Sequence, residues 1–88
     1  MSEHALVTGA AKRIGKALAL HLAGQGFCVS VHYNNSEAEA QQVVADIQAE
    51  GGKATAIQAD LADMKAVERL EAQAAAQFGP ITLLLNNA

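Results

Sequence analysis

The sequence has little of what several classes of protein require. It contains one cysteine, Cys28, so it can form neither an internal disulfide framework nor a cysteine-rich metal site. Aromatic residues make up 3% of the chain, and it has no run of 18 apolar residues and no signal-like amino-terminal stretch. The net charge of −3 provides no general attraction for nucleic acid or for an anionic membrane surface. We therefore expect a cytoplasmic protein that binds neither nucleic acid nor a membrane.

Hydrophobic residues make up 51% of the sequence, so the core must be built mostly from alanine, valine, leucine and isoleucine. That composition is typical of parallel sheets covered by helices. Short apolar runs alternate with helix-spaced patterns, which predicts the order β-α-β-α-β-α-β. The strands are predicted at residues 4–8, 27–33, 53–58 and 81–85. Because right-handed βαβ connections keep strands parallel, we predict one doubly wound α/β domain over residues 1–88, with strand order 3-2-1-4.

Sequence signals also place the ends and the buried faces of three helices. The first is predicted from about residue 13 to residue 25, and its apolar stripe comprises Ile14, Ala17, Leu18, His21 and Leu22. His21 is expected at the boundary between helix and sheet. A capping box of Ser36 and Glu39 begins the second helix, which is lined by Ala40, Val43, Val44 and Ile47. Asp63 is expected to cap the third helix, which displays Val67, Leu70, Ala74 and Phe78 and ends at Gly79 and Pro80.

A turn with two glycines follows the first predicted strand. A small residue at Gly9 lets backbone approach backbone, and Gly15 lets the helix pack close to the strand. Lys12 and Arg13 fall in the first helical turn, where the helix dipole disfavours each cation by roughly 0.3–1 kcal/mol unless an anion lies there. The turn therefore predicts a phosphate site. The alternative is that both cations are ordinary solvated charges beside a tight turn.

The end of the second predicted strand indicates which dinucleotide would fit. Folds that bind NAD usually place a carboxylate there, about 20 residues beyond the glycines, to bind the ribose 2′-hydroxyl. No carboxylate occurs here before Glu37. The residues present are His32, Tyr33, Asn34, Asn35 and Ser36. Neutral donors together with Arg13 suit a 2′-phosphate, which favours NADP(H) over NAD(H). The alternative is that the two asparagines only form a turn and that the serine is only a helix cap.

Three segments together resemble the short-chain dehydrogenase/reductase family across the whole chain. They are Thr8-Gly9 with Ile14-Gly15, Asp60-Leu61 after the third predicted strand, and Asn86-Asn87-Ala88 after the fourth. The stretches TGAAKRIG and HYNNSEAEA are most similar to pteridine reductases and related NADPH-dependent reductases, in which an arginine replaces the middle glycine of the fingerprint. Arg13 occupies that position. The resemblance implies the amino-terminal half of a Rossmann-type fold with NADP(H) as its cofactor.

The resemblance also implies which residues contact the cofactor. The pyrophosphate turn would be formed by Gly9, Ile14 and Gly15, and the 2′-phosphate would be contacted by Arg13 and Ser36. The adenine would be held by Asp60 and Leu61, and the nicotinamide-side ribose would be lined by Asn86, Asn87 and Ala88. The predicted set is completed by Lys12, Tyr33, Asn34 and Asn35. Without the resemblance, Asp60 is a loop carboxylate near the next helix.

The sequence departs from the family pattern in two ways. Some pteridine reductases have an arginine where this chain has Asn35, so one positive charge near the 2′-phosphate is missing. The family's catalytic serine, Tyr-x-x-x-Lys pair and further catalytic asparagine lie beyond the Asn-Asn-Ala turn, and this sequence does not contain them. Its only tyrosine, Tyr33, has Glu37 where the lysine would be. We therefore predict no catalytic residue here and no turnover by the chain alone.

The leading hypothesis is the cofactor-binding portion of a cytoplasmic short-chain reductase. Its small-molecule substrate, bound only by the intact parent, would carry a carbonyl or C=N bond, and a pterin is one candidate. A second hypothesis is a self-sufficient nucleotide-binding or interaction module, and a third is that the 88 residues are what remains of a longer protein. Without further strands, residues 81–85 would be an open apolar edge, so we expect self-association. The histidines lack metal-ligand spacing, and no metal site is predicted.

Overall fold

The structure is a computed structural model that describes residues 3–87. It contains the seven elements in the predicted order, which are β1 (His4–Val7), α1 (Arg13–Gly24), β2 (Cys28–Tyr33), α2 (Glu37–Ala49), β3 (Ala54–Gln58), α3 (Met64–Phe78) and β4 (Leu83–Leu85). Each strand is slightly shorter than predicted, most clearly β4, where strand pairing begins at Leu83. Across residues 3–87, none of the helices combines the length and the apolar character that crossing a membrane requires.

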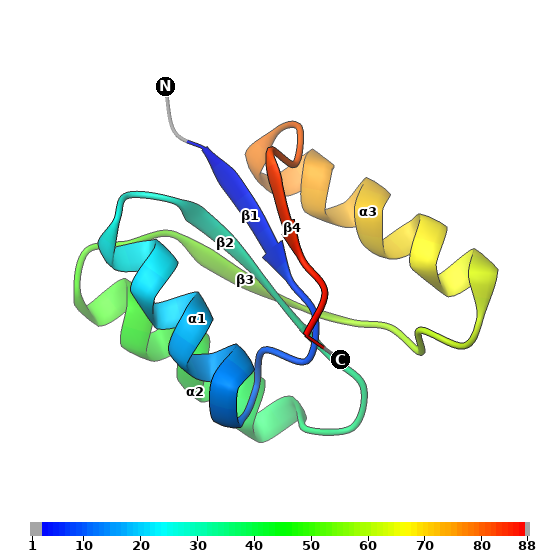
Figure 1. Cartoon of the computed structure of the whole chain (residues 1–88), viewed down its shortest axis with the longest axis horizontal. Helices are drawn as coiled ribbons and strands as arrows, with labels where there is room; N and C mark the ends of the chain where they lie inside the picture. Colours follow the sequence, from blue (N-terminus) through cyan, green and yellow to red (C-terminus); the bar gives the residue numbers. More distant parts are fainter. Residues whose placement is uncertain (1–2, 88) are drawn as a thin grey trace.

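All four strands are parallel and form one sheet in the predicted order, β3-β2-β1-β4. β1 is central, because its Val7 is in register with both Val31 of β2 and Leu85 of β4. Figure 1 shows β1 and β4 running side by side toward the same edge of the sheet. The chain winds outward from β1 in one direction through β2 and β3, and in the other direction to β4. Such a reversal places the ligand crevice outside the carboxyl ends of β1 and β4.

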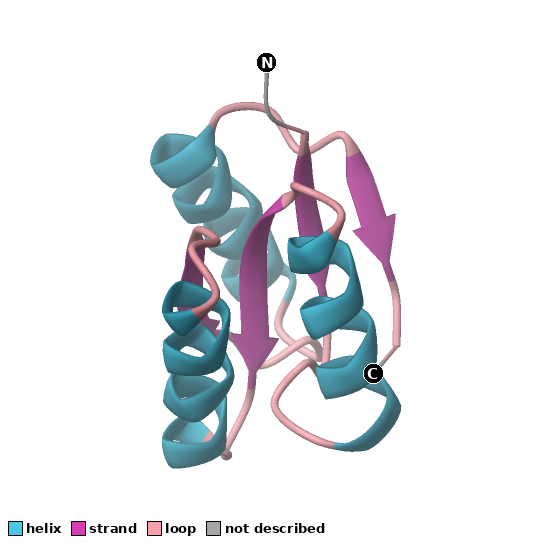
Figure 2. Ribbon diagram, turned by 90° about the vertical axis from the view of Figure 1, so that its left-hand side faces the viewer, coloured by secondary structure: helices cyan, strands magenta, loops and turns pink. Residues whose placement is uncertain are grey.

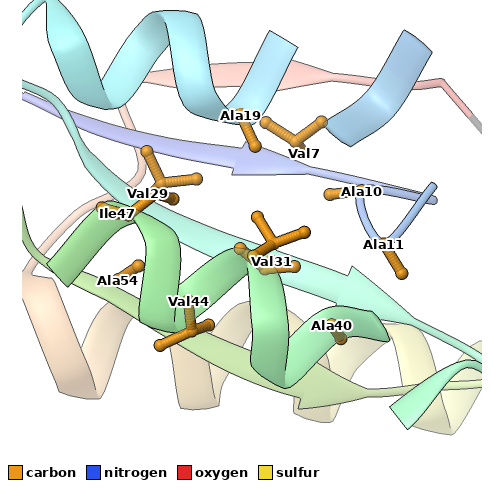
Figure 3. Packing of buried hydrophobic residues seen from close by; sticks show 11 residues of the cluster. Val7, Ala10, Ala11, Ala19, Val29, Val31, Ala40, Val44, Ile47 and Ala54 are labelled. Atoms are coloured by element: carbon orange, nitrogen blue, oxygen red, sulfur yellow. The ribbon is translucent and has the colours of Figure 1, made fainter. Parts of the chain in front are cut away.

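Helices cover both faces of this sheet. α1 and α2 lie on one face and α3 on the other, as Figures 1 and 2 show. Val29 and Val31 of β2 belong to the cluster under α1 and α2, seen in Figure 3. On the opposite face, Leu6 and Ile57 pack with Leu70 of α3. The buried members of both clusters are aliphatic, and the doubly wound architecture expected from the sequence is confirmed.

The face by which α1 meets the sheet differs from the prediction. Of the predicted stripe, Ile14, Ala17 and His21 are exposed, Ile14 to 70%, so His21 does not lie at a helix–sheet boundary. The buried residues of α1 are instead Gly15 and Ala19. Small residues allow α1 to approach the turn after β1 closely. The contact is therefore made by these small residues and not by the larger side chains. Ile14 is consequently left exposed at the amino end of α1.

The predicted helix caps have different outcomes. The carboxylate of Asp63 accepts hydrogen bonds from the backbone N–H groups of Lys65 and Ala66, which confirms the cap of α3. The predicted capping box of α2 is wrong, because the side chain of Ser36 makes no cap hydrogen bond and Glu39 pairs with a lysine before α1 instead. The buried residues of α2 are nevertheless those predicted, Ala40, Val43, Val44 and Ile47.

Candidate functional site

The turn after β1 depends on two glycines. Gly9 has a φ of 62°, in the left-handed region that glycine adopts without strain. Gly15, in the first turn of α1, lies directly against it. A Cβ at Gly15 would overlap the carbonyl oxygen of Gly9 and come within 2.6 Å of Asn87 Nδ2. The first N–H groups of a helix have no partner within it, so this junction presents backbone donors and a partial positive charge beside the end of β1.

The end of β4 is fastened to the same turn. The backbone N–H of Asn87 donates to the hydroxyl of Thr8 at 2.9 Å, and that hydroxyl lies 3.2 Å from Asn86 Oδ1, to which it donates. Asn87 Nδ2 donates to the carbonyl oxygen of Gly9 at 3.3 Å. The structure therefore brings Asn86 and Asn87 onto the glycine turn. Ala88, also predicted for the site, lies outside the described residues.

The end of β2 carries four predicted site residues. Tyr33 is half-buried in the last position of the strand, and Asn34 and Asn35 are exposed beyond it. Gln58 Nε2 donates to both the backbone and the side-chain oxygen of Asn34, each at 3.2 Å, which ties this loop to β3. Ser36 is half-buried, and its hydroxyl does not cap α2. The alternative that Ser36 serves only as a helix cap therefore loses its support.

Asp60 and Leu61 follow β3 and have different surroundings. Asp60 is exposed, and its Oδ1 accepts a hydrogen bond from the backbone N–H of Ala62 at 3.0 Å. This is a local turn interaction of the kind that aspartate commonly makes. Leu61 packs partly against the cluster under α3. Asp60 thus shapes its own loop while its carboxylate stays accessible to a ligand.

The two cations at the amino end of α1 have different partners. Lys12 Nζ lies 3.5 Å from Glu39 Oε2, and both side chains are about half exposed. A hydrogen bond from its own backbone N–H, together with the charge of Lys12, holds the pKa of Glu39 below its usual range. The chain itself therefore supplies an anion beside Lys12. Within residues 3–87, Arg13 has no carboxylate within 4.0 Å, so Arg13 is the cation left to bind an anion.

A cleft of about 900 Å³ lies at the opposite end of the sheet, beside the carboxyl ends of α1 and α2. Its lining is apolar at Leu20 and Phe27 and charged at Asp46, Glu50 and Lys53. The carboxyl ends of helices carry partial negative charge, and the two acids outnumber the one base. This cleft therefore disfavours an anion despite its size, and the carboxyl edge of the sheet is the candidate site.

The sequence model of the short chain dehydrogenase family matches residues 3–88. The chain belongs to the short-chain dehydrogenase family. The family resemblance carried by the glycine turn and by the Asn-Asn-Ala end of the sequence is thereby confirmed.

Relatives in this family match the chain along nearly its whole length. The 3-oxoacyl-acyl-carrier-protein reductase FabG of Staphylococcus aureus strain Mu50 is 43% identical over 88 residues, which are 36% of its own length. FolM alternative dihydrofolate reductase 1 from Brucella suis, solved in complex with NADP, has a TM-score of 0.92 at 45% identity, covering 98% of this chain and 34% of that one. A short chain dehydrogenase from Burkholderia cenocepacia in complex with NADP has a TM-score of 0.94 at 46% identity, covering 98% and 35%. The chain thus spans about a third of the length of these relatives.

The structure adds to the candidate site one residue that the sequence did not reveal. His32 is 2% exposed, with Nδ1 2.9 Å from the backbone nitrogen of Gly9 and Nε2 2.8 Å from the carbonyl oxygen of Ala59. Metal-ligand spacing does not find this role, and within residues 3–87 no group of three histidine, cysteine or acidic side chains gathers. A usable signal exists, because a polar residue in a central parallel strand is buried and must be hydrogen-bonded. His32 joins the glycine turn to the chain just before Asp60.

Proposed function

We propose that this chain binds NADP(H) at the carboxyl edge of its sheet, as the cofactor-binding part of an oxidoreductase. The observation that carries the proposal is the meeting of Gly9, Gly15 and Asn87, which makes a compact turn at the amino end of α1. Backbone donors and the helix dipole suit a pyrophosphate there. The NADP complexes of the Brucella suis and Burkholderia cenocepacia relatives support the choice of cofactor.

The order of the strands matches the order of the groups in the cofactor. Across the sheet, the strands run β3-β2-β1-β4. We assign the residues after β3, Asp60 and Leu61, to the adenine, and the loop after β2 to the 2′-phosphate. The turn after β1, with Gly9, Ile14 and Gly15, takes the pyrophosphate, and Asn86 and Asn87 after β4 take the second ribose. An extended NADP molecule laid across the edge meets these four segments in its own covalent order.

Arg13 is the residue that we propose for discrimination between NADP and NAD. It is exposed at the amino end of α1 and has no carboxylate partner within residues 3–87. The loop after β2 offers Asn34, Asn35 and Ser36 as neutral donors, with no acid before Glu37. A charged guanidinium with neutral donors stabilises a 2′-phosphate, whereas a free ribose 2′-hydroxyl gains little from the charge.

We propose reduction of a carbonyl or C=N bond as the reaction of the protein, for which bound NADPH supplies hydride. The names of two relatives, a 3-oxoacyl-acyl-carrier-protein reductase and an alternative dihydrofolate reductase, support these two bond types and keep a pterin among the candidate substrates. The residues of this chain bind and orient the cofactor. Because Tyr33 has Glu37 in place of the lysine of a Tyr-x-x-x-Lys pair, we propose that the 88 residues alone do not turn over. A cytoplasmic location suits the single buried thiol of Cys28.

The experiment that tests the cofactor assignment is calorimetric titration of the chain with NADP⁺ and with NAD⁺, with circular dichroism on the same sample. A folded chain that binds NADP⁺ more tightly than NAD⁺ is the expected result. A folded chain that binds neither contradicts the proposal as a whole. Equal affinities contradict only the role of Arg13 at the 2′-phosphate. Oxidation of NADPH by the 88-residue chain with a carbonyl substrate contradicts the proposed inactivity.

The edge formed by β4 favours a second property, self-association. Within the described chain, β4 pairs with β1 on one side only, and Leu84 is 54% exposed. An open apolar strand presents unpaired N–H and C=O groups to any other chain. We propose that copies of this chain pair through this edge. Sedimentation should show a mass that rises with concentration, and a monomer over the whole range contradicts the proposal.

A further inference from the structure

His32 holds the glycine turn through both its side chain and its backbone. The backbone N–H of Gly9 donates to Nδ1 of the ring at 2.9 Å, and the backbone N–H of Ala10 donates to the carbonyl oxygen of His32 at 3.0 Å. The other ring nitrogen, Nε2, lies 2.8 Å from the carbonyl oxygen of Ala59. One buried residue near the carboxyl end of β2 thus contacts the turn after β1 and the residue that follows β3.

The partners of the ring determine which ring nitrogen carries the hydrogen. The backbone N–H of Gly9 can only donate, so Nδ1 must carry a lone pair. The carbonyl oxygen of Ala59 can only accept, so Nε2 must carry the hydrogen. Only the neutral ring with its hydrogen on Nε2 satisfies both contacts, and the other neutral tautomer would oppose two hydrogens at Gly9 and two lone pairs at Ala59.

This arrangement decides which donors of the turn face an anion. The N–H groups of Gly9 and Ala10 are occupied by His32, so the donors left for a phosphate are those at the start of α1, around Arg13 and Ile14. The ring also fixes the separation between the turn after β1 and the loop that begins at Asp60.

We propose that His32 is a positioning residue for NADP(H). Its Nδ1 holds the backbone N–H of Gly9, and the contact of Nε2–H with Ala59 selects the ring tautomer that can do so. The inference rests on the proposed cofactor, because the two segments that the ring connects are those assigned to the pyrophosphate and to the adenine. It adds a residue to the site that acts from beneath the turn. Loss of the contact to Gly9 frees that N–H and loosens the turn, which weakens binding of the dinucleotide.

His4 provides a matched control on the neighbouring strand. Its ring is 1% exposed, with Nε2 2.7 Å from Ser30 Oγ and Nδ1 2.9 Å from the carbonyl oxygen of Gly79. Those contacts lie at the amino end of the sheet, away from the proposed cofactor. The substitutions His4→Phe and His32→Phe each replace a buried ring by a larger apolar ring and remove two ring hydrogen bonds. They share their chemistry and differ in position.

Two further variants separate the two contacts of His32. In His32→Asn the side-chain oxygen can take the place of Nδ1 and accept from Gly9, whereas in His32→Gln the side-chain N–H can take the place of Nε2 and donate to Ala59. An unpaired buried backbone donor corresponds to about a tenfold change in an equilibrium. We expect NADP⁺ to bind His32→Gln and His32→Phe about tenfold more weakly per folded molecule, and His32→Asn and His4→Phe almost as well as the unchanged chain.

Nuclear magnetic resonance of the unchanged chain tests the ring directly. Correlations between ring nitrogens and carbon-bound hydrogens should show a bare Nδ1 and a protonated Nε2 on His32 at neutral pH. The amide of Gly9 should be protected from hydrogen exchange in the unchanged chain and in His32→Asn, and should lose that protection in His32→Gln.

Three results overturn the inference. They are protonation of Nδ1, equal loss of NADP⁺ affinity in His32→Asn and His32→Gln, and a loss in His4→Phe as large as in His32→Phe. If the unchanged chain binds no NADP⁺, the proposed function fails by itself. The ring tautomer and the exchange of the Gly9 amide then still decide whether His32 holds the turn.

Discussion

The two ends of the sheet are fastened by the same kinds of residue. At the amino end, the ring of His4 is hydrogen-bonded at both nitrogens, and Thr82 bonds the backbone of His4 through its hydroxyl at 3.0 and 3.2 Å. At the carboxyl end, the ring of His32 is also bonded at both nitrogens, and the hydroxyl of Thr8 bonds the end of β4. At each end a histidine and a threonine connect a central strand to segments that are distant along the chain.

The difference between the two ends lies in the backbone. The parallel topology places the carboxyl ends of α1 and α2 at the amino end of the sheet, beside the cleft of about 900 Å³, and places helix amino ends at the opposite edge. Helix amino ends attract anions and helix carboxyl ends repel them. Similar side-chain contacts therefore only stabilise the fold at one end, whereas at the other they shape a site for an anionic ligand. The size of a cleft is therefore a poor guide to where the ligand site lies.

Breaking the close contact at the carboxyl end should have the largest effect. In Gly15→Ala the new Cβ would overlap the backbone of Gly9, so we expect a loss of about 1–3 kcal/mol in the free energy of unfolding and no detectable binding of NADP⁺. The matched change at the amino end of the sheet is Gly24→Ala, at the last residue of α1, where no atom lies within 4 Å of the new Cβ. It should stabilise α1 by up to about 1 kcal/mol and leave binding unchanged. For each variant, urea unfolding measures the free energy of unfolding and calorimetry measures the affinity for NADP⁺. Normal NADP⁺ binding by Gly15→Ala would show that the two glycines need not meet.

The two threonines test whether the ends differ in function as well as in charge. Thr8→Val leaves the N–H of Asn87 without its acceptor and should cost about 1–3 kcal/mol of stability as well as weaken NADP⁺ binding. Thr82→Val removes two hydrogen bonds from a residue more exposed than Thr8 and should cost about 0.5–1.5 kcal/mol with no change in affinity. Equal losses of NADP⁺ affinity in the two variants would mean that the whole sheet, and not its carboxyl edge, sets the affinity.

Charge can be removed from each end with one substitution. Arg13→Gln should weaken binding of NADP⁺ about tenfold, the value of one charge-assisted hydrogen bond, and leave NAD⁺ binding almost unchanged. Lys53→Gln removes one positive charge from the cleft at the amino end of the sheet and should change the affinity for neither NADP⁺ nor NAD⁺. The ratio of the two dissociation constants, measured by calorimetry, is the readout. An unchanged ratio in Arg13→Gln would assign the 2′-phosphate to another residue.

The smallest effect is expected at the pair formed by Glu39 and Lys12. Because the pKa of Glu39 is lowered in the folded chain, its ionised form favours folding. The contribution is present above the pKa that Glu39 has in the unfolded chain and is lost as the pH falls through its lower folded pKa. Glu39→Gln should therefore be slightly less stable than the unchanged chain at neutral pH and equally stable in acid, a gap that salt reduces. A gap that persists in acid would assign the effect to helix propensity and not to charge.

The sequence was sufficient to predict the elements and the strand order, because apolar runs and helix-spaced patterns report local structure and βαβ connections have one hand. It failed for the face of α1. Periodicity weighs large side chains such as Ile14, whereas the close contact is made by Gly15 with Gly9 and with Asn87, which is distant along the chain. The residues of α1 that are buried are its small ones, and the hydrophobicity of small residues does not predict which of them are buried.

Pairings between distant side chains were also beyond the sequence. Ser36 and Glu39 have the spacing of a capping box, yet Glu39 pairs with Lys12, which is brought close only when α1 and α2 pack side by side. His32 has no partner near it in sequence, since its partners Gly9 and Ala59 lie just after two other strands. The segments that form the site could be predicted from their positions after strands, whereas their mutual contacts depend on the assembled sheet.

Arg13 sets folding and binding against each other within one residue. Its φ of 55° places a non-glycine residue in the left-handed region, which costs about 1 kcal/mol or more. Glycine would remove that strain and would also remove the charge. The arginine is therefore useful only if its charge raises affinity by more than roughly fivefold, the factor equivalent to about 1 kcal/mol. A selection for thermostability alone would replace this residue early. If Arg13 binds the 2′-phosphate as proposed, the resulting protein would be more stable and less selective for NADP over NAD.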